Sequence, residues 1–148
     1  RSALLDKLTT GGFNRRFQPV KTGCEWITSD EEIAASYGRD PLRCFRFTVN
    51  AYDNMFVSIG EAQSARRMKG IPKSLPLLLI SGECDPVGGF GKGVRAAYAR
   101  YQAAGLQQVR CLLYPGCRHE LLNEVNRETV YADLLDWMNA HMAAGQKG

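Results

Sequence analysis

The sequence predicts an α/β fold in which parallel strands alternate with helices. Its C-terminal half contains two short apolar runs, at residues 77–80 and 109–114, of the kind found in strands buried inside a parallel sheet. After a turn, each run is followed by a longer segment whose apolar side chains recur at helical spacing. A strand, helix, strand, helix order with connections of this length favours right-handed parallel crossovers.

The part of the chain before these runs shows no convincing strand pattern and is predicted to be mainly helical. Residues 9–21 have no steady period of either strand or helix, so we expect a loop there. Ser29 and Glu32 have the S-x-x-E spacing of a capping box, which predicts a helix starting at Ser29 and ending at Gly38. A second helix is expected over residues 56–68.

The first predicted strand ends at Ser81 and Gly82 and leads into an amphipathic helix. The apolar face of that helix consists of Phe90, Val94, Ala97, Tyr98, Tyr101 and Ala104. Gly105 is predicted to end the helix, because glycine readily adopts the left-handed conformation that closes many helices.

The second predicted strand is interrupted by Pro115 and Gly116, and Asn126 is placed to cap a final helix. The apolar stripe of that helix consists of Val130, Leu134, Trp137, Met138 and Met142. Two parallel strands alone expose edges that act as templates for aggregation. Because the chain also begins at Arg1, we expect it to be a fragment or one product of a nicked precursor, with more strands upstream.

The composition is typical of a soluble globular protein, with 45% hydrophobic and 23% charged residues. The longest apolar run, residues 75–80, is far shorter than the ~20 residues that span a bilayer. The net charge of +4 is spread along the chain, which argues against a nucleic-acid partner. Five cysteines without a C-x-x-C pair argue against a disulfide framework and a zinc site, and they indicate a reducing, cytoplasmic location.

Two polar loops follow the predicted strands and carry the best candidates for chemistry, Asp85 and His119. Ligands of open α/β sheets gather at the carboxyl ends of the strands, so we expect these side chains at one edge of the sheet. A carboxylate that accepts a hydrogen bond from a histidine is two thirds of a catalytic triad. The alternative is structural, with Asp85 serving a turn before Pro86 and His119 serving as a cap.

Residues 77–87 (LLLISGECDPV) and 114–120 (YPGCRHE) resemble the last two conserved blocks of a group of α/β-hydrolases that includes monoacylglycerol lipases, bacterial lysophospholipases and related serine peptidases. In that family the acid follows the penultimate core strand and the histidine follows the last one. The resemblance therefore implies that Asp85 and His119 are catalytic. It extends over about residues 24–141, and the upstream part is similar to the helical cap of these enzymes.

The family's nucleophile lies in a G-x-S-x-G turn between a strand and a helix, and no serine here has glycine at both positions. The nearest match surrounds Ser58, but it lacks the first glycine. The resemblance therefore implies that the serine and the oxyanion hole belong to an upstream half of the hydrolase, on the same precursor or a second chain. Residues 1–70 would form the cap, and residues 71–148 the C-terminal part of the core.

The implied activity is hydrolysis of small, lipid-like carboxylic esters, without a cofactor or metal ion. Trp26, Phe45 and Phe56 are compatible with a lipophilic entrance and with transient membrane contact through the cap, although core packing explains them equally well. A catalytically inactive interaction or structural module with a hydrolase-like fold is the alternative.

Smaller expectations concern residues near the two candidates. Arg118 and Glu120 flank His119 and are expected either to pair across its loop or to be solvated. Cys84 and Cys117 are expected to be half-buried thiols rather than nucleophiles. His141 is expected to be a favourable charge near a helix C-terminus.

Overall fold

The computed structural model describes residues 1–43 and 45–145 of the 148-residue chain. Its helices are α1 (Ala3–Thr9), α2 (Glu31–Arg39), α3 (Val49–Ala62), α4 (Ala65–Lys69), α5 (Lys92–Ala103) and α6 (Arg127–Gly145), with 3₁₀ helices η1 (Phe13–Arg16) and η2 (Leu121–Asn123). Its strands are β1 (Leu77–Gly82) and β2 (Val109–Tyr114). None of the described helices has the length and apolar character that a bilayer-spanning segment needs.

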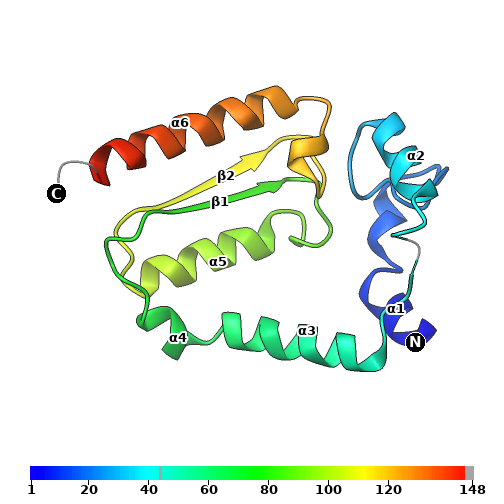
Figure 1. Cartoon of the computed structure of the whole chain (residues 1–148), viewed down its shortest axis with the longest axis horizontal. Helices are drawn as coiled ribbons and strands as arrows, with labels where there is room; N and C mark the ends of the chain where they lie inside the picture. Colours follow the sequence, from blue (N-terminus) through cyan, green and yellow to red (C-terminus); the bar gives the residue numbers. More distant parts are fainter. Residues whose placement is uncertain (44, 146–148) are drawn as a thin grey trace.

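The two strands pair in parallel, with Leu77 opposite Val109 and Gly82 opposite Tyr114. The prediction of a strand, helix, strand, helix order is thus confirmed, and β2 has the predicted bounds. In Figure 1, α5 lies below the strands and α6 above them. Gly105 has φ +92°, which confirms its predicted role at the end of α5.

The start of α5 differs slightly from the prediction, because Phe90 precedes the helix instead of opening it. Phe90 has φ +57°, and its neighbours Gly89 and Gly91 have φ +61° and +80°. Three successive positive φ angles make a tight turn that cannot be part of a right-handed helix.

A small core lies between the strands and α6, beside the loop that follows β2. Its buried members are Tyr114, Cys117, Leu121 and Val130, and Ile80, Leu112 and Leu134 pack against them. Tyr114 also donates a hydrogen bond from its hydroxyl to Oδ2 of Asp133, 2.9 Å away. Burial, together with Asp133, raises the pKa of Tyr114 to about 12. The carboxyl end of β2 is therefore fixed to α6 by both apolar and polar contacts.

The helix predicted from Ser29 exists, but its capping residue is not Ser29. Helix α2 begins at Glu31, and Oδ1 of Asp30 accepts hydrogen bonds from the N–H groups of Glu32 and Ile33, both 3.1 Å away. Ser29 instead donates to Glu124, which is distant in sequence. The capping residue is therefore Asp30, one residue after the predicted Ser29, whose polar groups have a long-range partner instead.

The helix predicted over residues 56–68 is in fact two helices. Helix α3 starts earlier, at Val49, because Oγ1 of Thr48 accepts a hydrogen bond from the N–H of Ala51. It ends at Ala62, and α4 begins after Ser64. The loop predicted over residues 9–21 contains the 3₁₀ helix η1.

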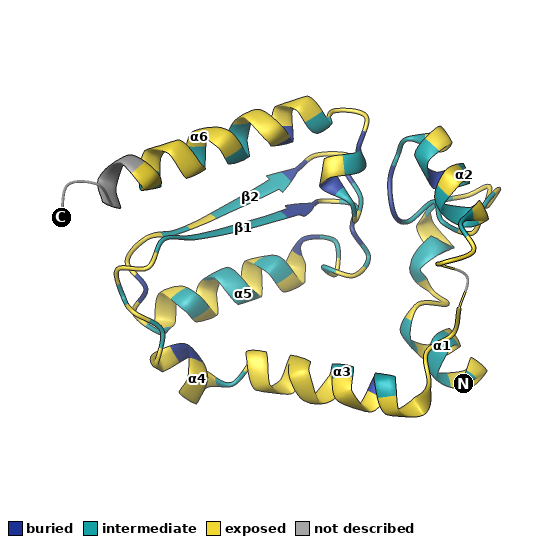
Figure 2. Ribbon diagram, in the orientation of Figure 1, coloured by how far each residue is buried: buried dark blue, intermediate teal, exposed yellow. Residues whose placement is uncertain are grey.

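Burial along the strands increases toward their carboxyl ends. In Figure 2 the strands are half-buried over most of their length, and they are buried where β1 ends at Ser81 and Gly82 and where β2 ends at Tyr114. Beyond these ends lies the segment that leads into α2 (Figure 1). The N-terminal segment thus covers the edge of the sheet at which the candidate residues emerge.

Candidate active site

Asp85 lies in the tight loop after β1 and is 6% exposed. Its two carboxylate oxygens have different partners. Oδ1 accepts a hydrogen bond from the N–H of Val87, 2.8 Å away, which stabilises the turn around Pro86. Oδ2 lies 3.2 Å from Nδ1 of His119. Asp85 therefore stabilises the turn before Val87, as the structural alternative expected, and it also contacts His119.

His119 lies in the loop after β2, and its side chain is 38% exposed. Its Nδ1 contacts Asp85, so with Nδ1–H as the donor the other ring nitrogen, Nε2, is left in the acceptor form of the neutral ring. The indole of Trp26 packs against the imidazole, with ring centroids 5.1 Å apart and planes tilted by 41°. The expectation that Asp85 and His119 meet at one edge of the sheet is confirmed.

The two loops approach closely because Gly82, at the end of β1, has no side chain. A Cβ atom at this position would lie 2.2 Å from the backbone oxygen of Cys117, which is far inside contact distance. The loops are then joined by hydrogen bonds from the N–H of Glu83 to Tyr114 (3.0 Å) and from the N–H of Cys84 to Cys117 (2.9 Å). The loops that carry Asp85 and His119 are therefore joined by backbone hydrogen bonds.

The electrostatics of the pair favour an ionised carboxylate and a more basic imidazole. Burial raises the pKa of Asp85, but hydrogen bonds from His119 and Val87 outweigh it, so this pKa lies below its ordinary value. The hydrogen bond to Asp85 raises the pKa of His119 above its ordinary value; burial opposes this effect, and the charges of Asp85 and Glu120 add to it. Such an imidazole is suited to accept and return a proton.

Of the two alternatives considered for Arg118 and Glu120, pairing across the loop is wrong, because each side chain has a different partner. Arg118 donates from Nη1 to the backbone oxygens of Glu25 and Thr28, the latter 3.0 Å away. Glu120 accepts at Oε2 from Nδ2 of Asn123, 2.6 Å away. The Arg118 side chain thus ties the histidine loop to the N-terminal region.

The sequence interpretation overlooked Glu124, which is fully buried with 0% exposure. Its carboxylate contacts the backbone N–H of Arg118, next to His119, at 2.6 Å. The only local signal is a charged residue among the apolar residues of the segment LLNEV. Cys84 is half-buried, as predicted, whereas Cys117 is buried and donates to Oδ1 of Asn126, 3.1 Å away.

Across residues 1–43 and 45–145 the structure brings together no group of three or more His, Cys, Asp or Glu side chains that could hold a metal ion. His141, in the last turns of α6, is 2.7 Å from the backbone oxygen of Trp137 through Nδ1.

Comparison with known proteins identifies the family of this chain. Residues 3–126 match the family model described as serine aminopeptidase, S33. The chain belongs to this family. A curated relative, the monoacylglycerol lipase of Mycolicibacterium smegmatis, is 25% identical over 119 residues, which are 78% of this chain and 39% of that protein.

Solved structures similar to this S33 chain are α/β-hydrolases, which confirms the predicted fold class. A thermostable carboxyl esterase from Bacillus coagulans, solved with glycerol, is 29% identical with a TM-score of 0.82, over 94% of this chain and 46% of that chain. A lipase in an open form is 27% identical with a TM-score of 0.80, over 93% and 45%. The chain therefore spans less than half the length of these relatives.

Proposed function

We propose that this chain is the C-terminal part of a serine hydrolase of carboxylic esters, in which His119 is the catalytic base and Asp85 orients it. The observation that carries the proposal is the 3.2 Å contact between Nδ1 of His119 and Oδ2 of Asp85 at the carboxyl ends of adjacent parallel strands. The proposal is supported by the resemblance of residues 77–87 and 114–120 to the last two conserved blocks of the family, which implies that Asp85 and His119 are the triad acid and histidine.

In the proposed reaction a serine from outside these 148 residues attacks the ester carbonyl, and His119 accepts the serine proton at Nε2. The resulting imidazolium is stabilised by Asp85 and returns the proton to the leaving alcohol. Water then attacks the acyl-enzyme, with His119 again accepting and returning a proton, and this step releases the carboxylic acid and the free serine. Ser58, the nearest match to the elbow pattern, lies inside α3 and not on a turn between a strand and a helix. We therefore place the nucleophile in an upstream half of the hydrolase.

We propose a monoacyl, lipid-like ester as the substrate, admitted beneath a cap formed by residues 1–70. A cleft of about 630 Å³ opens beside Trp26 and is lined by aromatic side chains that include Phe45, Phe47 and Tyr52. Trp26, which lines this cleft, also packs against His119, the ring proposed as the base. Such a cleft suits an acyl chain. Phe45 and Phe56 are 53% and 49% exposed and could touch a membrane surface.

The substrate class is tested by assaying the intact protein on a medium-chain monoacylglycerol and on an aminoacyl p-nitroanilide of similar size. We expect ester hydrolysis with kcat/KM in the usual enzyme range of about 10⁴ to 10⁸ M⁻¹ s⁻¹, and no amide cleavage above background. Preferential amide cleavage would contradict the ester assignment. No cleavage of either compound would favour the inactive-module alternative.

A further inference from the structure

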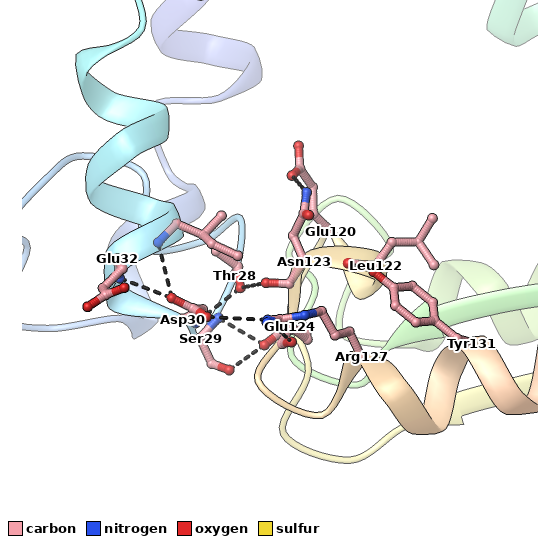
Figure 3. A network of polar contacts seen from close by, with 11 residues as sticks. Thr28, Ser29, Asp30, Glu32, Glu120, Leu122, Asn123, Glu124, Arg127 and Tyr131 are labelled. Carbon is pink, nitrogen blue, oxygen red and sulfur yellow. Dashed lines mark hydrogen bonds and ion pairs between the residues drawn. The ribbon is translucent and has the colours of Figure 1, made fainter.

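A buried carboxylate, Glu124, joins the histidine loop to the segment that precedes α2. Its Oε1 accepts a hydrogen bond from the N–H of Arg118 at 2.6 Å, and its Oε2 accepts from the N–H of Ser29 at 3.0 Å and from the Ser29 hydroxyl. Figure 3 shows Ser29 and Glu124 pointing toward each other from the two segments. We call these three residues and their hydrogen bonds the Glu124 network.

The Glu124 network acts on the residue directly before His119, and a second contact fixes the residue after it. The N–H of Glu120 donates to the backbone oxygen of Ile27, 2.7 Å away. Nearby, Oγ1 of Thr28 donates to the backbone oxygen of Asn123, also 2.7 Å away (Figure 3). The backbone is therefore held on both sides of His119, by Glu124, which is itself bonded to Ser29, and by Ile27.

The chemistry at this position requires a carboxylate. All three groups that face Glu124 are donors, and an ionised carboxylate has only acceptors. A glutamine has one acceptor oxygen, so its NH₂ group would face the donor of either Arg118 or Ser29. A buried donor without an acceptor is unfavourable, so one of the two segments would have to move.

The Glu124 carboxylate lies where the start of α2, the start of α6 and the loop of His119 come together. Ser29 precedes Asp30, which caps α2, and Asp30 lies 3.5 Å from Nη1 of Arg127, the first residue of α6. Nη1 of Arg127 also donates to the backbone oxygen of Glu124, 3.2 Å away. Glu124 is therefore bonded to the segment before α2, to the first residue of α6 and to the loop of His119.

We propose that Glu124 is a positioning residue that sets the distance between His119 and Asp85 by holding the histidine loop against the segment before α2. The inference rests on the proposed function, in which His119 is the base. Glu124 acts through Arg118 and does not itself touch the imidazole. Its loss allows the loop to relax, which lengthens the Nδ1–Oδ2 contact and misplaces Nε2 relative to the serine.

The test is Glu124→Gln in the intact protein, with kcat, KM and the pKa of the His119 imidazole as readouts. The pKa is measured by NMR, and the His119 resonances are assigned with His119→Ala. We expect kcat for ester hydrolysis to fall about 10- to 100-fold, the effect of a misplacement of about 1 Å, with KM little changed. The raised pKa of His119 should fall toward its ordinary value of about 6.5.

Two further variants separate positioning from folding. Ser29→Ala removes one donor from the Glu124 network and leaves the carboxylate, so we expect kcat to fall about three- to tenfold, the effect of one hydrogen bond, even if Glu124→Gln does not fold. Tyr131→Phe is the matched control, because the Tyr131 hydroxyl donates to the backbone oxygen of Leu122 in the same loop, 2.7 Å away, but not beside His119. It should leave kcat and the pKa of His119 unchanged.

The proposal is overturned if folded Glu124→Gln and Ser29→Ala proteins keep the wild-type kcat and the wild-type pKa of His119. An equal loss of kcat in Tyr131→Phe would also overturn it, since any disturbance of the loop would then suffice. If the wild-type protein hydrolyses no ester, the proposed function fails, and the pKa of His119 in the variants still decides whether Glu124 positions the ring.

Discussion

Replacing His119 by alanine is expected to lower kcat for ester hydrolysis by the intact protein about 10⁴- to 10⁶-fold. Without the imidazole no group in the site accepts the serine proton or protonates the leaving alcohol. The fold should survive, because the side chain is 38% exposed and lies in a loop. Asp85 keeps the hydrogen bond from Val87 after the change. The measurements are kcat on a monoacyl ester and the urea midpoint of unfolding.

The control for this prediction is His141→Ala, at the other histidine of the chain. His141 lies in α6, with Nδ1 2.7 Å from the backbone oxygen of Trp137, and has no place in the proposed chemistry. We expect its kcat to equal that of the wild type. A stably folded His119→Ala protein that retains ester hydrolysis would remove His119 from the mechanism.

Replacing Asp85 by asparagine is expected to lower kcat about 10⁴-fold and to lower the pKa of His119. The asparagine amide can donate to Nδ1, which favours the tautomer with the proton on Nε2 and disables the base. In the wild type the hydrogen bond to Asp85 raises the pKa of His119, so activity declines as the pH falls through that raised value. The acidic limb of the residual activity should therefore move to lower pH.

The same pair makes stability depend on pH in two directions. The pKa of Asp85 is lowered by folding, so its contribution is present above its ordinary value of about 3.9 and is lost as the pH falls. The pKa of His119 is raised, so its contribution is complete below about 6.5 and is lost as the pH rises through the folded value. The pair therefore stabilises most between about pH 4 and 6.5.

For Asp85→Asn, the pH profile of kcat/KM and an NMR titration of His119 are the measurements. The free energy of unfolding should also lose the pair's contribution to its decline below about pH 4 and above about pH 6.5. Asp136→Asn, in α6, is a control that keeps the charge change but lies outside the site. An unchanged acidic limb in a folded Asp85→Asn protein would show that Asp85 does not act on His119.

Features set by neighbouring residues could be predicted from the sequence. The two strands follow from short apolar runs, and the end of α5 follows from Gly105, whose positive φ suits glycine. The meeting of Asp85 and His119 follows from strand polarity, because the carboxyl ends of parallel strands lie at one edge of a sheet. The family resemblance added the roles that these two side chains take.

Features set by contacts distant in sequence could not be predicted. Ser29 fits a local capping box, but its donors bind Glu124, 95 positions later. Asp30 caps the helix instead. Arg118 and Glu120 are near each other in sequence, yet Arg118 reaches the backbone of Thr28, 90 positions away. Local spacing says nothing of such partners, and these contacts hold the histidine loop in place.

The most direct test of the proposed triad is labelling of the intact protein with a fluorophosphonate, followed by denaturing mass spectrometry and peptide mapping. We expect one label on a serine outside these 148 residues, and no labelling after His119→Ala, because the serine then lacks its base. A label on Ser58 or on another serine of this chain would contradict the assignment of the nucleophile. A folded intact protein without any label would contradict the assignment of this chain to an active serine hydrolase.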